Sequence, residues 1–90
     1  MPLYTFFLEY RGGTYISQVR ARSSALATKA WARKFTKMKV KGLGAQSKSD
    51  LIRKILIDAP TSLDGLINAW CSSAIVRGHL ALIHFTQTEE

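Results

Sequence analysis

The chain has 90 residues, 47% of them hydrophobic and 10% aromatic, and its formal net charge is +7. This length allows one domain spanning residues 1–90, and the apolar content excludes a disordered chain. The uncharged apolar runs are far shorter than the ~20 residues that a membrane-spanning helix needs, and the first nine residues lack the basic start of a secretory signal. We therefore expect a folded cytoplasmic domain that does not cross a membrane.

Positive charge is concentrated in one segment of the chain. Eleven of the 13 Lys and Arg residues fall between Arg20 and Lys54, and Asp50 is the one acid in that stretch. Such a concentration creates a positive potential that attracts polyanions. The charge is the strongest indication of function in the sequence, and it names a class of partner only.

The chain begins with the pattern of a β-hairpin. Residues 3–10 alternate between apolar and other side chains, Gly12-Gly13 follows, and residues 14–21 are rich in β-branched and aromatic types. Glycine supplies the positive φ of a tight turn, so we predict a two-residue turn at Gly12-Gly13 that pairs Phe6 with Val19.

The same alternation assigns the two faces of the hairpin. The even-numbered residues from Tyr4 to Tyr10 should face the core. The opposite face then displays one aromatic side chain among polar ones, and we predict it to be an interaction face formed by Phe7, Ile16, Gln18 and Arg20.

A first amphipathic helix is predicted from the N-caps Ser23 and Ser24 to Met38. Its apolar spacing indicates that Leu26, Ala30, Trp31 and Phe35 pack on the sheet. Its opposite side carries a row of bases four residues apart, Lys29, Arg33 and Lys37, with no acid to relieve their repulsion.

A second helix is predicted after the Gly42-Leu43-Gly44 turn. Ser47 and Asp50 have the spacing of a capping box, and an apolar stripe continues until Pro60 stops the helix. This helix adds Arg53 and Lys54 to the positive surface, and the connector before it adds Lys39 and Lys41.

The remaining chain predicts a further hairpin. Thr61 and Asp64 have a cap spacing that predicts one short helical turn. Residues 66–76 fit a strand or part of a helix, Arg77-Gly78 can turn, and residues 79–88 are apolar on both faces, which is typical of an interior strand. The expected order is ββααββ: an α+β fold with a four-stranded, mainly antiparallel sheet and two helices on one face.

Catalytic chemistry finds little support in the sequence. His79 and His84 are five residues apart, so a strand places them on opposite faces, and the single cysteine, Cys71, is typical of a small buried side chain. The acids offer no dependable pair for acid–base work. We expect no catalytic residue, no metal and no cofactor, and interpret the chain as a protein that is not an enzyme.

The strand, glycine turn, strand and helix from Tyr4 to Phe35 are similar in outline to HicB-type antitoxin domains. The likeness covers about a third of the chain. The Pro-containing loop and Gly-Cys pair of those domains are missing, so the resemblance implies a shared supersecondary arrangement.

Two hypotheses of function follow. The first is a small non-catalytic domain that binds a nucleic acid, either RNA or DNA without strong sequence preference, through its basic helical face. The phosphate contacts would come from Arg22, Lys29, Arg33, Lys37, Lys39, Lys41, Arg53 and Lys54. The alternative is a protein–protein interaction module, either a homodimer or a small inhibitor or antitoxin-type partner, that uses the open sheet face.

Overall fold

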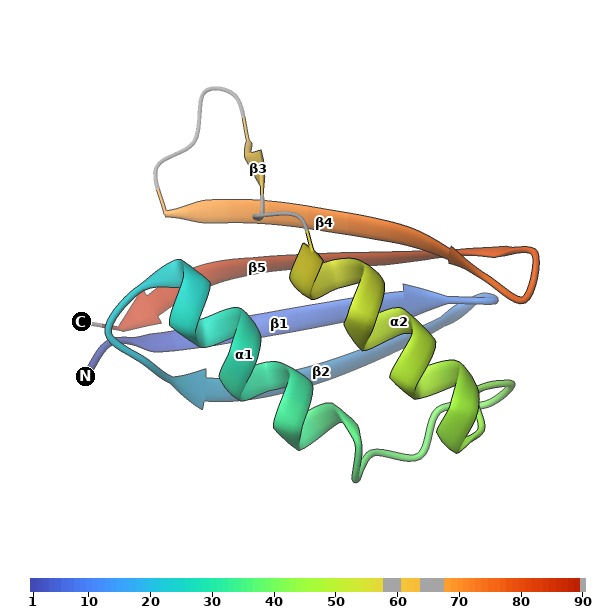
Figure 1. The fold of residues 1–90 in the computed structure, drawn as a ribbon. Helices are drawn as coiled ribbons and strands as arrows, with labels where there is room; N and C mark the ends of the chain where they lie inside the picture. The colour runs from blue at the N-terminus through green and yellow to red at the C-terminus, as the bar shows by residue number, and fades with distance from the viewer. Residues whose placement is uncertain (58–60, 64–67, 90) are drawn as a thin grey trace.

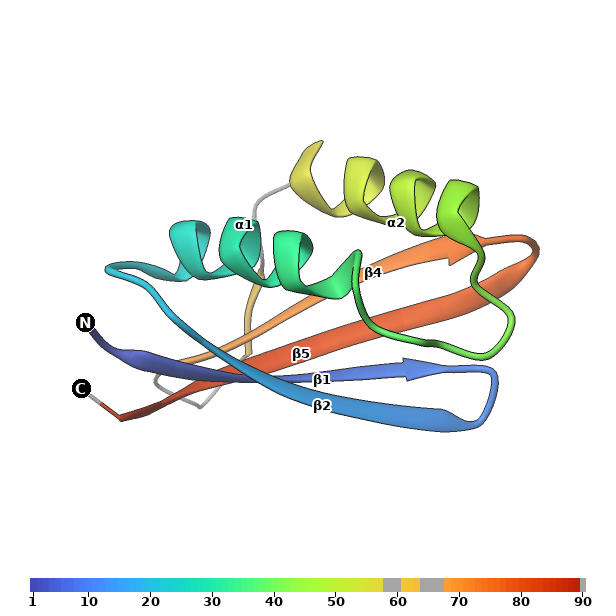
Figure 2. The ribbon, with the colours of Figure 1, turned by 90° about the horizontal axis from the view of Figure 1, so that it is seen from below.

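Four long antiparallel strands form a sheet, and two helices lie on one of its faces (Figures 1 and 2). The computed structural model describes residues 1–57, 61–63 and 68–89. The elements in chain order are β1 (Leu3–Tyr10), β2 (Gly13–Arg20), α1 (Ser24–Phe35), α2 (Ala45–Ile57), β3 (Thr61–Ser62), β4 (Ala69–Val76) and β5 (His79–Glu89). The strand order is β2-β1-β5-β4-β3, with β3 a two-residue addition beside β4.

The predicted α+β class and the ββααββ order of the long elements are confirmed. Residues 69–76, for which strand and helix were both open, form β4, while residues 66 and 67 lie outside the described residues. The apolar strand β5 is interior, because it pairs with β1 on one side and β4 on the other. Within the described ranges, neither helix is long and apolar enough to span a bilayer.

The β1–β2 hairpin turns one residue earlier than predicted. Arg11 and Gly12 occupy the turn, with φ of 50° and 82°, and Phe6 pairs with Ser17 instead of Val19. Gly13 belongs to β2, where a Cβ would lie 2.8 Å from the Tyr15 hydroxyl oxygen. The register moves by two residues, which preserves the side-chain parity, so the predicted faces remain correct.

A stack of aromatic rings joins the sheet to α1. The Phe6 ring lies between those of Phe85 and Trp31, with centroid distances of 4.3 and 5.5 Å, and Trp31 stacks on Phe35 at 4.7 Å. All four side chains are at most 1% exposed. The core therefore lies between the sheet and the helices, with its largest side chains drawn from β1, β5 and α1.

The helix α1 differs from its prediction at two places. Ser23 is the N-cap, since its Oγ accepts from the Leu26 N–H at 3.3 Å, but the helix ends at Phe35, three residues before Met38. Leu26 was expected to pack on the sheet, and this was wrong, because it is 47% exposed while Ala27 is fully buried. Leu26 lies in the first turn, where α1 begins beside the end of β2.

Two predicted caps in the second half of the chain are also wrong. The helix α2 begins at Ala45, because the Gly44 carbonyl accepts the first helical hydrogen bond from the Lys48 N–H at 3.0 Å. Ser47 is therefore a buried residue within the helix and not its N-cap. Thr61 begins the strand β3, which pairs with Cys71 of β4, instead of a helical turn. Strand pairing outweighs a local cap spacing here, and Asp64 lies outside the described residues.

The aromatic stack predicts a large difference between two apolar residues of α1. Trp31→Ala should lower the free energy of unfolding by about 3–5 kcal/mol, because it removes the ring between Phe6 and Phe35. Leu26→Ala, the matched control, should cost about 0.5 kcal/mol, as exposed substitutions do. Urea unfolding of both variants measures this, and equal losses would contradict the packing described.

Candidate functional site

A groove with basic sides opens where the end of β2 meets the first turns of α1. Its volume is about 370 Å³. Four of its lining side chains are basic and the other four are apolar; in chain order they are Met1, Arg20, Ala21, Arg22, Leu26, Lys29, Ala30 and Arg33. We call this the α1 groove. The exposed Leu26 that the sequence placed in the core is therefore part of an apolar lining between positive charges.

Local structure positions these basic groups. The Ala21 N–H donates to the Pro2 carbonyl at 3.1 Å, which holds the N-terminal segment against the end of β2. Arg20 donates to the Met1 carbonyl at 2.9 Å and pairs with Glu89 at 3.1 Å. Lys29 and Arg33 are four residues apart and therefore neighbours on one side of the helix.

The basic groups of the α1 groove differ in their pairing. Arg20 is an exposed partner of Glu89, whereas Arg22, Lys29 and Arg33 make no ion pair with any residue that the structure describes. No lining residue of the groove is acidic. Three exposed cations thus remain available for an anionic ligand.

The connector between the helices continues the positive charge. Lys37, Lys39 and Lys41, three of the predicted phosphate contacts, are exposed. Lys37 follows the end of α1, so it does not extend the helical row with Lys29 and Arg33. Lys48, by contrast, donates to the Met38 carbonyl and lies 5.9 Å from the centre of the Phe35 ring, which gives it a structural role.

The predicted pair Arg53 and Lys54 lies elsewhere. α1 packs over β2 and α2 over β4, so the outer sides of the helices point to opposite edges of the sheet. Arg53 and Lys54 both contact Asp50, and Lys54 also donates to the Ile75 carbonyl at 2.7 Å. The structure does not bring them together with Lys29 and Arg33, and a phosphate contact by either stays a prediction.

Lysines from the helix layer also cover both long edges of the sheet. Lys34 donates to the Gln18 carbonyl of β2 at 2.8 Å, and Lys54 contacts β4 as described above. Exposed strand edges offer unpaired backbone groups to other chains, and lysine is a common way of blocking them. These two ammonium groups therefore serve the fold.

The open sheet face carries the second predicted site. Phe7 pairs with Ile16 across the strands, and its ring stacks on His84, with centroids 5.1 Å apart and an interplanar angle of 11°. Ile16 is 61% exposed, whereas Phe7 is half-buried. Gln18 and Arg20 complete the row along β2, but both are engaged: Gln18 Nε2 donates to Thr5 at 3.0 Å.

Three of the groups with catalytic potential, His84, Glu9 and Cys71, are neighbours on the open face, and His79 is apart from them. His84 lies on the open face, with Nε2 3.3 Å from a Glu9 carboxylate oxygen and Cys71 as its cross-strand neighbour on β4. His79 contacts the edge of the Tyr10 ring on the other face. In the part of the chain that the structure describes, no three His, Cys, Asp or Glu side chains form a group able to hold a metal ion.

One cation beside the predicted set was missed by the sequence. Arg11 lies outside the segment from Arg20 to Lys54, yet the structure places it beside Lys41 and Tyr15, where these three residues line one pocket with Gly12 and Gly13. Thirty residues separate Arg11 from Lys41, and no periodicity in the sequence connects them. The one available signal was the position of Arg11 before two glycines.

The fold and the site define a small α+β protein with a basic groove on its helical side. Comparison with protein-family models, with curated proteins and with solved structures finds no match to this chain. These comparisons give no support to the outline similarity with HicB-type domains.

The contacts of Asp50 predict a pH-dependent contribution to stability. The hydrogen bond from Lys54, assisted by Arg53 and opposed by desolvation, lowers the pKa of Asp50 below its ordinary value of 3.8. A carboxyl group with a lowered pKa in the folded state stabilises the fold above its unfolded pKa, and this stabilisation is lost as the pH falls through the folded pKa. Asp50→Asn should therefore lower Tm at neutral pH, and the difference from wild type should shrink as the pH falls below 3.8 and vanish below the lowered pKa of the folded state.

Thermal unfolding followed by circular dichroism, at pH values from neutral to below the lowered pKa of Asp50, measures this difference in Tm. Gln46→Ala serves as a control for a change on the same helix that removes no charge. A Tm difference for Asp50→Asn that persists unchanged into acid would contradict the assigned contacts.

Proposed function

We propose that the chain is a non-catalytic nucleic-acid-binding domain that holds a phosphate backbone along the α1 groove and the connector that follows. The observation that carries this is the groove itself, in which four basic side chains surround an apolar lining without an acid. A solvated surface without a ligand normally intersperses both signs of charge. Here α1 carries no acid at all.

The chemistry of the groove favours a backbone over a base sequence. Arginine and lysine contact phosphate oxygens well, and phosphate contacts fix register without reading sequence. The apolar lining from Leu26, Ala30 and Met1 offers no hydrogen-bonding group to a base edge. We therefore infer binding to RNA or DNA with little sequence preference.

The aromatic pair of Phe7 and His84 does not extend this surface. The pair lies on the open face, whereas the α1 groove borders α1, which lies on the other face of the sheet. Figure 2 shows both helices on that face. Single-strand binders usually combine basic grooves with stacking side chains on one surface. Binding at the α1 groove should thus be dominated by electrostatics and be sensitive to salt.

Charge reversal in the groove tests the proposal. Lys29→Glu with Arg33→Glu should weaken binding to a labelled single-stranded oligonucleotide at least about tenfold, because two phosphate contacts become repulsive. The slope of log K against log salt should fall by about 1.4 for two lost contacts with a single strand. Fluorescence anisotropy at several salt concentrations measures both quantities.

The matched control has the same charge change at another place. Arg53 and Arg77 are exposed residues that border a different pocket, beside Asp50. Arg53→Glu with Arg77→Glu should retain most of the affinity. If both double variants lose affinity equally, binding follows net charge and the α1 groove is not the site.

A second candidate function rests on the open sheet face. Ile16, Ile75 and Leu80 are 61%, 56% and 56% exposed, and the half-buried Phe7 lies beside the first of them. Their positions on β2, β4 and β5 place them on the face opposite the helices. This distribution favours a protein contact, and we propose a second copy of the chain as the simplest occupant.

Sedimentation of one surface variant tests the second candidate. Ile16→Ser should convert a dimer to a monomer without loss of secondary structure. Ile57→Ser, which changes a residue 70% exposed at the end of α2, should leave the dimer intact. A wild-type protein that is monomeric at high concentration would remove this candidate.

A further inference from the structure

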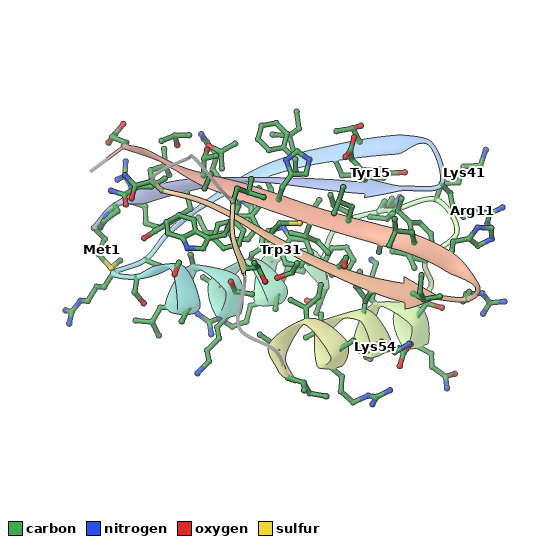
Figure 3. The ribbon with its side chains drawn as sticks, turned by 90° about the horizontal axis from the view of Figure 1, so that it is seen from above. Met1, Arg11, Tyr15, Trp31, Lys41 and Lys54 are labelled. Carbon is green, nitrogen blue, oxygen red and sulfur yellow. The ribbon has the colours of Figure 1, made fainter. Side chains whose placement is uncertain are left out.

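A separate pocket lies where the β1–β2 turn meets the loop between the helices. Its volume is about 350 Å³, and its lining residues are Arg11, Gly12, Gly13, Tyr15 and Lys41. We call it the turn pocket. Figure 3 shows Arg11, Tyr15 and Lys41 together at the end of the molecule away from Met1. We propose that the turn pocket binds a phosphate group.

Backbone geometry brings the Arg11 side chain to the loop that carries Lys41. Lys41 and Gly42 form a turn closed by the Leu43 N–H, which donates to the Val40 carbonyl at 3.0 Å, and Gly42 has φ of 87°. The Arg11 side chain packs directly on Gly42, where a Cβ would lie 2.9 Å from the guanidinium nitrogen Nη1. The positive φ is what requires glycine at position 42, and the Arg11 side chain lies against it.

Tyr15 connects the two turns and keeps a hydroxyl proton that it can donate. Its ring packs on Gly13, and its hydroxyl oxygen accepts from the backbone N–H of Lys41 at 3.3 Å. A tyrosine hydroxyl has one proton to donate besides its acceptor capacity. Because the Lys41 N–H uses the oxygen as acceptor, the hydroxyl proton is left for a ligand.

The charge of the pocket suits a phosphate. None of its lining residues is acidic, and among the described residues neither Arg11 nor Lys41 makes an ion pair. Arg11 also borders a neighbouring hollow that contains Glu9, but the Glu9 carboxylate lies 3.3 Å from His84. A planar guanidinium, an ammonium and a hydroxyl together match the several acceptor oxygens and the negative charge of a phosphate.

The site shares no residue with the α1 groove, and it shares Lys41 with the connector that the proposed function includes. Two sources supply the same chemistry: the terminal phosphate of a nucleic-acid strand, and a free phosphate or small phosphate ester. The volume of the pocket is at the lower end of the range for small-molecule sites, which accommodates either.

Titration of the ¹⁵N-labelled full chain with inorganic phosphate tests the proposal, with sodium chloride at equal ionic strength as the blank. The amide signals of Gly12, Gly13, Lys41 and Gly42 should shift saturably with phosphate alone. Arg11→Gln should weaken binding at least about tenfold and Tyr15→Phe about fivefold, as loss of a charged and of a neutral hydrogen bond predicts.

The turn between β4 and β5, which also contains an Arg-Gly pair, provides a matched control. Arg77 and Gly78 have φ of 52° and 78°, nearly the conformation of Arg11 and Gly12, but Arg77 does not line the turn pocket. Arg77→Gln therefore carries the same backbone and charge change, and phosphate affinity should be unchanged. Equal losses in the two variants, or shifts that also appear with chloride, would overturn the proposal.

Two oligonucleotides of one sequence, with a 5′-phosphate or a 5′-hydroxyl, distinguish the sources. A gain in affinity from the 5′-phosphate that Arg11→Gln abolishes identifies a strand terminus; phosphate binding without such a gain identifies a small phosphate ligand. In the Lys29→Glu, Arg33→Glu double variant, the amide signals of Gly12 and Lys41 should still shift when phosphate is added. Failure at the turn pocket is therefore separable from failure at the α1 groove.

Discussion

The stack of Phe85, Phe6, Trp31 and Phe35 couples the helix layer to the sheet. Trp31 and Phe35 are one turn apart and fix which side of α1 faces inward. Two residues correspond to a rotation of about 200° on a helix, so Lys29 and Arg33 must point away from that core. The packing of the aromatic rings therefore determines the direction in which the basic row points. Lys29 and Arg33 need no ion pair to keep that direction.

The sheet then separates two surfaces of different chemistry. Its helical side carries Lys29 and Arg33, while its open side carries exposed aliphatic residues around Phe7 and His84, and Arg20 borders both. A polyanion and a protein partner would meet different sides of the same molecule and need not compete. Such a division permits a small chain to bind two partners at once, although both surfaces are supported by the same hydrophobic core.

Patterns of short range predicted most of the fold. Alternation in β1 gave the correct faces, and the apolar run of β5 gave its interior place. The hairpin register was not predictable, because Arg11 accepts a left-handed φ that glycine more commonly takes and Tyr15 needs Gly13 free of a Cβ. The site was harder still. Charge alone led us to group Arg53 with the basic row of α1, whereas the orientation of the two helices separates them. Arg11 and Lys41 are thirty residues apart in the sequence, and only the tertiary fold places them beside each other.

The two edge lysines limit how copies of this chain could assemble. Lys34 occupies an outward carbonyl of β2, and Lys54 occupies one of β4 beyond the short strand β3. A second chain that extended the sheet sideways would have to displace an ammonium group from its oxygen. The two lysines therefore disfavour continuous strand addition, whereas stacking of two sheets ~10 Å apart through the broad face would leave both contacts intact.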